Sequence, residues 1–111
     1  MHGRFFALWE FTVTNSQEWL SQAHSALDVL RAREGFIESH IMRSPDEPLS
    51  FVVHTTWRDV GSYRRALGSS ESKMVVWPFL AEMQDRPTAY EELVVATLDG
   101  ITQFDSSVAE G

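Results

Sequence analysis

Three aromatic residues and one histidine are the side chains of this sequence that could bind or transform a small molecule. They are Trp9, Trp57, Tyr63 and His54. Indole rings can line a pocket for a flat apolar ligand, and a tyrosine hydroxyl can hydrogen-bond a phenol or a developing oxyanion. An unperturbed imidazole titrates near neutrality, so His54 could act as a proton shuttle. These residue types favour chemistry on a flat aromatic molecule.

Each of these residues also has a structural interpretation, and the sequence leaves both open. Aromatic residues in strands usually belong to a packed core, so Trp9 and Trp57 could fill the interior instead of lining a pocket. Tyr63 could hold its hydroxyl at the surface of a helix. His54 could be a hydrogen-bonded histidine at an interface.

Metal chemistry is not expected of this sequence. A metal site needs three or four convergent ligands. The chain has no cysteine and no HxH or HExxH pattern. The basic pair Arg64-Arg65 is more typical of a solvated helix face than of a ligand clamp.

Hydrophobic periodicity predicts the elements that must position these residues. Alternation typical of strands runs through 5–14, 36–44, 49–58 and 89–98. Helical spacing runs through 16–33, with Asn15 or Ser16 as a possible N-cap. It resumes in a segment that Asp59 can cap and that continues past residue 70. Pro78 predicts a kink or a new helix start. This order predicts an α+β class, ferredoxin-like split βαβ fold with a four-stranded antiparallel sheet.

The strand phase sorts the candidate residues onto two faces of this sheet. His54 falls on the face away from the helices, and most of the candidate aromatic residues fall on the helix-facing side. The candidate substrate-binding side chains are Trp9, Phe51, Val53, Trp57, Leu67 and Trp77.

The face away from the helices predicts a second copy of the chain. It would carry Phe6, Leu8, Val52 and half of the apolar run 93–96. Burying such side chains stabilises by about 1.5–3 kcal/mol each. A second sheet of the same kind is the simplest cover, so we expect a homodimeric α+β barrel.

Length and charge narrow the possible partners. The 111 residues suit one domain, which we place at 1–100 with a tail at 101–111. A net charge of -7 disfavours nucleic acid and anionic membrane surfaces as partners. No secretory signal or spanning segment is visible, so we expect a cytoplasmic protein.

Several runs of the sequence resemble the antibiotic biosynthesis monooxygenase family. They are Gly35-Phe36, 43–48 (RSPDEP), 55–60 (TTWRDV) and 63–67 (YRRAL), within a resemblance that covers 5–98. The resemblance implies a dimeric α+β barrel. Some members of this family oxidise aromatic polyketide phenols to quinones with oxygen and with no metal or organic cofactor. Other members degrade haem, and many have no known activity.

The resemblance can be carried over residue by residue. Quinone-forming members have a Trp at the end of the third strand and a Tyr six positions later, which Trp57 and Tyr63 match. The resemblance thus implies that these two residues are catalytic. The family Asn four positions before the Trp is Val53 here, and the family Arg falls near Trp77. Haem degradation is disfavoured, because Trp9 replaces an Asn of the first strand and no His follows His54.

The leading hypothesis is a cofactor-free monooxygenase that oxidises an aromatic or polyketide-like phenol. A non-catalytic dimeric module that binds small molecules is the alternative that the missing Asn and Arg favour. A cyclase or isomerase, in which His54 or Tyr63 moves protons, is the third.

Overall fold

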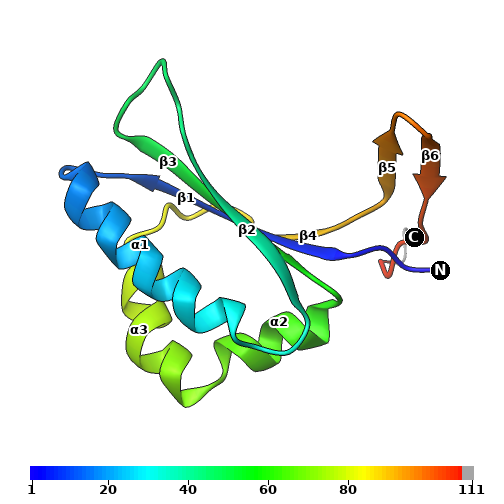
Figure 1. Cartoon of the computed structure of the whole chain (residues 1–111), viewed down its shortest axis with the longest axis horizontal. Coiled ribbons are helices and arrows are strands. Elements are labelled where there is room, and N and C mark those ends of the chain that lie inside the picture. Colours follow the sequence, from blue (N-terminus) through cyan, green and yellow to red (C-terminus); the bar gives the residue numbers. More distant parts are fainter. Residues whose placement is uncertain (109–111) are drawn as a thin grey trace.

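Three helices lie on one face of a four-stranded antiparallel sheet in the computed structural model, which describes residues 1–108 (Figure 1). The strands are β1 (Phe5–Thr12), β2 (Phe36–Arg43), β3 (Ser50–Trp57) and β4 (Ala89–Glu91), and their order in the sheet is β2-β3-β1-β4. The helices are α1 (Ser16–Arg31), α2 (Val60–Leu67) and α3 (Ser70–Leu80). The predicted α+β, ferredoxin-like class is confirmed.

Side-chain caps begin the first two helices, as the sequence predicts. The side chain of Asn15 accepts a hydrogen bond from the backbone N–H of Glu18 at 3.1 Å, at the start of α1. Asp59 accepts from the N–H of Ser62 at 2.7 Å, at the start of α2. Each bond satisfies an N–H that has no partner inside its helix. The cap at Asp59 fixes where Tyr63 lies, one turn later.

A new helix start at Pro78 is not observed. Helix α3 runs through this proline, which lies in its last turn. Proline removes one backbone donor, and near a helix end that loss affects a single turn. The next backbone bond, from the N–H of Ala81 to the carbonyl of Trp77 at 3.0 Å, is still made.

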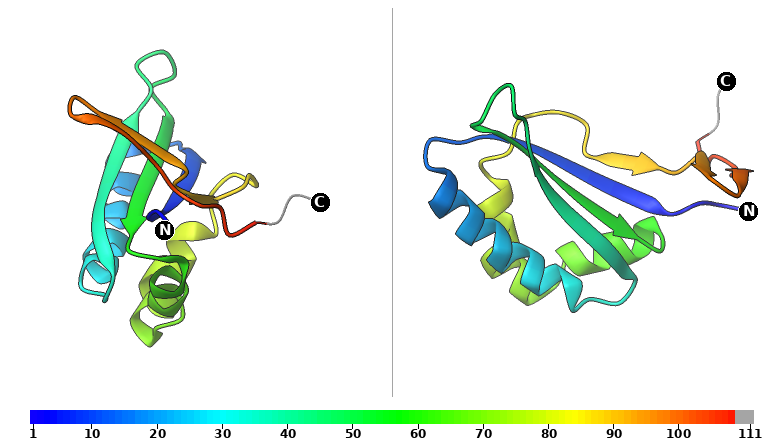
Figure 2. Two further views of the ribbon diagram at one scale, coloured as in Figure 1. Left: turned by 90° about the vertical axis from the view of Figure 1, so that its right-hand side faces the viewer. Right: turned by 45° about the horizontal axis from the view of Figure 1, so that its top comes forward.

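The core lies between the sheet and the helices, and it contains the helix-facing side chains of β1 and β3 (Figure 2). Trp9, Phe51, Val53 and Trp57 are all at most 2% exposed. The two strands pair with Trp9 opposite Val53 and Phe11 opposite Phe51. The predicted strand phase is therefore confirmed on this face.

The predicted fourth strand, 89–98, is wrong in extent. Strand β4 ends at Glu91, and the chain then forms a separate antiparallel hairpin of β5 (Val94–Thr97) and β6 (Gly100–Gln103). This hairpin projects from the end of the sheet (Figures 1 and 2). Gly100, with φ of +147°, lies at the turn of this hairpin. The sequence alone predicts only that a strand ends there.

The hairpin alters two expectations from the sequence. The apolar run 93–96 does not join the open sheet face, and Leu93 and Val94 are about half exposed. Residues 101–103 of the expected tail belong to β6. The boundary between 1–100 and 101–111 stays a prediction, and residues 109–111 of that tail lie outside the described residues.

Gly35 sets a close approach between the start of β2 and helix α2. Its φ is +87°, in the region that favours glycine. A Cβ atom built at this position would lie 2.2 Å from the Ser62 hydroxyl oxygen. The carbonyl of Gly35 also accepts from the N–H of Arg58 at 2.7 Å. The absence of a side chain at residue 35 therefore allows α2 to pack where it does.

Candidate functional site

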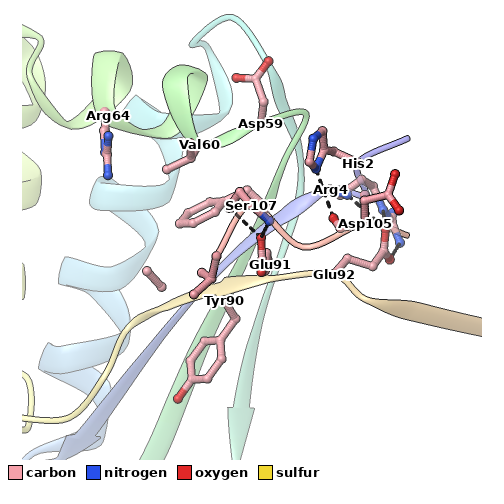
Figure 3. A pocket seen from close by; sticks show the side chains of 14 residues that line it. His2, Arg4, Asp59, Val60, Arg64, Tyr90, Glu91, Glu92, Asp105 and Ser107 are labelled. Carbon is pink, nitrogen blue, oxygen red and sulfur yellow. Dashed lines mark hydrogen bonds and ion pairs between the residues drawn. The ribbon is translucent and has the colours of Figure 1, made fainter. Parts of the chain in front are cut away.

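A cavity of about 520 Å³ lies at the end of the sheet, where the N-terminal segment, α2, β4 and residues 105–108 meet (Figure 3). This volume is within the range of small-molecule sites. We call it the end cavity. It is lined by His2, Gly3, Arg4, Phe5, Asp59, Val60, Arg64, Ala89, Tyr90, Glu91, Glu92, Asp105, Ser107 and Val108.

Phe5 connects the end cavity to the aromatic residues that the sequence singles out. It lines the cavity, and its ring centroid lies 5.0 Å from that of Tyr63. The Tyr63 ring in turn lies 5.7 Å from the Trp57 ring, edge to face. Both Phe5 and Tyr63 are buried. The end cavity is therefore separated from the Tyr63–Trp57 pair by one phenyl ring.

The environment of Tyr63 keeps its hydroxyl protonated. Burial raises the pKa of this group above its usual value, because the charged phenolate would lose its hydration. A side-chain hydrogen bond with Trp9 acts in the opposite direction and is the smaller effect. A neutral hydroxyl of this kind is a hydrogen-bond donor at physiological pH.

Trp57 is packed as a core residue. It is fully buried, and its indole N–H donates to the Thr55 hydroxyl oxygen at 2.9 Å. The Phe36 ring meets it edge to face at 5.2 Å. Its N–H is thus satisfied within the fold and is not directed at a ligand. Trp57 contacts Tyr63 and can position it.

The other candidate substrate-binding residues do not gather around the end cavity. Trp9, Phe51 and Val53 belong to the core, and none of them lines the end cavity. Leu67 is partly buried at the edge of the core. Trp77 is half exposed on α3, and its indole N–H donates to the carbonyl of Leu67 at 2.9 Å.

His54 lies on the opposite face of the sheet from Tyr63, as its strand phase predicts. Its ring stacks between Phe6, at 5.1 Å, and His40, at 5.8 Å. Desolvation lowers the pKa of His54, and the neighbouring His40 lowers it further, although Glu38 opposes this. His54 does not line the end cavity.

Charged residues of the end cavity were not among the sequence candidates. Arg4 and Glu92 form an ion pair of 2.9 Å, and this partner lowers the pKa of the Glu92 carboxyl. Glu91 accepts hydrogen bonds from the Ser106 hydroxyl and from the N–H and hydroxyl of Ser107. Glu91 ends β4, Glu92 follows it, and the serines lie in the expected tail, where no periodicity signals a site.

No group of three or more His, Asp or Glu side chains within residues 1–108 is arranged to hold a metal ion. None of the helices described there combines the length and apolarity needed to cross a bilayer.

The chain is similar in sequence to one protein family and in structure to several known proteins. The family model for antibiotic biosynthesis monooxygenase matches residues 6–76. A conserved protein from Methanosarcina mazei Go1 is similar in structure, with a TM-score of 0.67 and 21% identity over 80% of this chain and 92% of that one. A variant of SnoaB, a cofactor-independent oxygenase from Streptomyces nogalater, has a TM-score of 0.67 and 18% identity over 96% and 98% of the two chains. No curated protein sequence matches the chain.

Proposed function

Because this chain belongs to the antibiotic biosynthesis monooxygenase family, we propose that it is a cofactor-independent monooxygenase acting on an aromatic or polyketide-like phenol. One observation carries the proposal. The Trp57 and Tyr63 rings, which have the spacing of the quinone-forming members, lie 5.7 Å apart directly behind the Phe5 wall of the end cavity.

The reaction balances with oxygen as the only co-reactant. A phenol and O₂ give a quinone and water: one oxygen atom enters the ring, and the other leaves with the two displaced hydrogens. The phenolate form of the substrate supplies the electrons that reduce O₂. A site that stabilises this oxyanion favours ionisation of the phenol, and the phenolate donates an electron to O₂ far more readily than the neutral phenol does.

Tyr63 is the residue that we assign to the substrate oxygen. Its hydroxyl is buried and protonated, so it can donate a hydrogen bond to a phenolate. Phe5 lies between the Tyr63 ring and the end cavity, so a substrate in the cavity reaches Tyr63 only if Phe5 moves. Trp57 acts through Tyr63 by ring contact, and the Trp9 side chain acts on the pKa of the Tyr63 hydroxyl. We therefore treat both tryptophans as positioning residues.

We also propose that the active form is a homodimer in the cytoplasm. Phe6, Leu8 and Val52 are only partly buried on the open sheet face, and Met42 there is 47% exposed. The β5–β6 hairpin leaves Leu98 and Ile101 largely exposed, and a two-stranded hairpin alone has little stability. A second copy of the chain could cover both the sheet face and the hairpin.

A binding module without catalysis is the second candidate. The observation in its favour is that Trp57 and Val53 are fully buried and that the Trp57 indole N–H is satisfied by Thr55. In this case the aromatic residues support the core, and the end cavity binds a ligand that is not transformed.

Oxygen uptake tests the proposal. Metal-free protein is mixed with anthrones and naphthols, and oxygen consumption and quinone absorbance are followed. Tyr63→Phe should abolish turnover while the substrate still binds. Tyr90→Phe is the matched control, because Tyr90 is the other tyrosine of the chain, lines the end cavity and bonds the carbonyl of Pro87.

The outcomes separate the two candidates. Loss of turnover in Tyr63→Phe alone supports the monooxygenase. Ligand binding without oxygen uptake by the wild-type protein supports the binding module. Equal activity of Tyr63→Phe and wild-type protein would contradict the assigned role of Tyr63.

A further inference from the structure

Arg64 differs from the other charged side chains of the end cavity in its lack of a partner. It extends from α2, is exposed, and makes no ion pair or side-chain hydrogen bond within residues 1–108 (Figure 3). We propose that Arg64 makes the end cavity selective for aromatic ligands that carry an acid group. The proposal concerns the same cavity as the proposed function and rests on it for the aromatic nature of the ligand.

The remaining cationic groups of the end cavity are already engaged. The Arg4 guanidinium holds both carboxylate oxygens of Glu92, at 2.9 and 3.4 Å. The His2 ring lies 3.0 Å from the carbonyl oxygen of Asp105. A ligand acid group would have to displace an existing partner from Arg4, whereas at Arg64 it would displace water alone.

Three of the four carboxylates that line the end cavity have a cationic partner, and the fourth, Glu91, is held by hydrogen-bond donors alone within residues 1–108. Glu91 is bonded to Ser106 and Ser107, and Asp59 accepts from the Ser62 N–H at 2.7 Å. Arg58 lies 3.3 Å from the second Asp59 oxygen and so balances its charge. Arg64 is thus the cationic side chain of the end cavity that has no carboxylate partner within residues 1–108, and a ligand acid group would give it one.

The apolar wall lies beside this cation. Val60 precedes Arg64 by one helical turn and also lines the cavity, and Phe5 and Val108 complete an apolar surface. Figure 3 shows Arg64 and Val60 on the α2 side, with Tyr90, Glu91 and Ser107 on the facing side. Fused rings can rest on this surface while a carboxylate meets the planar guanidinium, which is suited to two parallel hydrogen bonds.

Arg65 provides a matched control on the same helix. Its guanidinium lies 3.4 Å from the Ser62 hydroxyl oxygen and next to Gly61, and it does not line the end cavity. Arg64→Met and Arg65→Met remove the same charge from adjacent exposed positions. Both variants keep a residue of good helix propensity, so the fold of α2 is retained.

The test compares two ligands of nearly equal shape by calorimetry with the full-length protein. One is 2-naphthoate, which is anionic at pH 7.5, and the other is 2-naphthamide, which is neutral. We expect the wild-type protein to bind 2-naphthoate about tenfold more tightly, the size of one charge-assisted interaction. Arg64→Met should remove this preference without changing the affinity for 2-naphthamide, and Arg65→Met should retain it.

Several results would overturn the inference. These are equal affinities for the two ligands, no binding of either at millimolar concentration, or the same loss of preference in both arginine variants. Amide chemical shifts that move at Val60 and Tyr90 on titration would place the ligand in the end cavity, and shifts confined elsewhere would contradict it. Binding is measured without turnover, so a failure to consume oxygen refutes the proposed function and leaves this result intact.

Discussion

The indole N–H of Trp57 donates to the hydroxyl oxygen of Thr55, two residues earlier on the same strand, at a distance of 2.9 Å, with both side chains fully buried. Because adjacent residues of a strand point to opposite faces, residues two apart share one face. The bond therefore joins two neighbours on the helix-facing side of β3. It fixes the orientation of the ring that contacts Tyr63.

Replacing Thr55 with valine should destabilise the protein, because it leaves the Trp57 N–H buried without a partner. The expected loss in free energy of unfolding is about 1–3 kcal/mol. In a Trp57→Phe background the same change should cost less, since no indole N–H remains. Urea denaturation of the two single variants and the double variant measures this coupling. Strictly additive effects would show that the bond contributes nothing to stability.

His54 should make stability depend on pH between neutrality and mild acid. Its pKa is lowered in the folded state, first by desolvation and then by His40, with Arg4 acting in the same direction and Glu38 against it. As the pH falls below about 6.5, the unfolded imidazole takes up a proton before the folded one does. The free energy of unfolding therefore decreases on acidification until the folded pKa is passed.

Denaturation at pH 7.5 and pH 5.5 checks this expectation. His54→Gln should show a smaller decrease than the wild-type protein, and His24→Gln, a change at an exposed position of α1, should behave as wild type. An NMR titration that places the His54 pKa above the ordinary value would contradict the prediction.

Glu91 should hold residues 106–108 against the end cavity. Its carboxylate accepts from the Ser107 N–H at 2.9 Å, and the hydroxyls of Ser106 and Ser107 also donate to it. Those contacts, the Ser106 hydroxyl first, lower the pKa of Glu91. Glu91→Gln removes the charge and one acceptor, so the Ser107 amide should exchange with solvent several-fold faster. Glu47→Gln, in the turn between β2 and β3, is the control.

The open sheet face should carry the proposed dimer contact. Val52→Glu places a charge on that face and should give a monomer in sedimentation experiments, because a buried unpaired charge strongly opposes association. Met74→Glu puts the same charge on α3, at a side chain 77% exposed, and should leave the mass unchanged. A wild-type protein that is already monomeric at high concentration would refute the dimer.

The sequence predicts most of the fold because its signals are local. Asn15 and Asp59 act as caps, and alternation along β1 and β3 places Trp9 and Trp57 in the core. The end of β4 is not predictable from the sequence, because apolar residues on both faces suit either a buried strand or an exposed hairpin. The order of alternating residues does not distinguish the two.

The candidate site was less predictable. Spacing indicates that Trp57 and Tyr63 lie close together, and they do. The end cavity is formed by the N-terminal segment, β4 and residues 105–108, which meet only through tertiary contacts between residues about a hundred positions apart. Whether an aromatic residue lines a cavity or fills the core depends on packing, and composition gives no measure of it.

The contact between Gly35 and Ser62 has a consequence for mutant libraries built to change the substrate range. Ser62 precedes Tyr63 and Arg64 on α2, and a Cβ at position 35 would overlap its hydroxyl. Randomising position 35, or enlarging position 62, would displace the helix that presents both residues. Diversity introduced at Val60 and Tyr90, which are both exposed, would vary the shape of the end cavity and leave its scaffold in register.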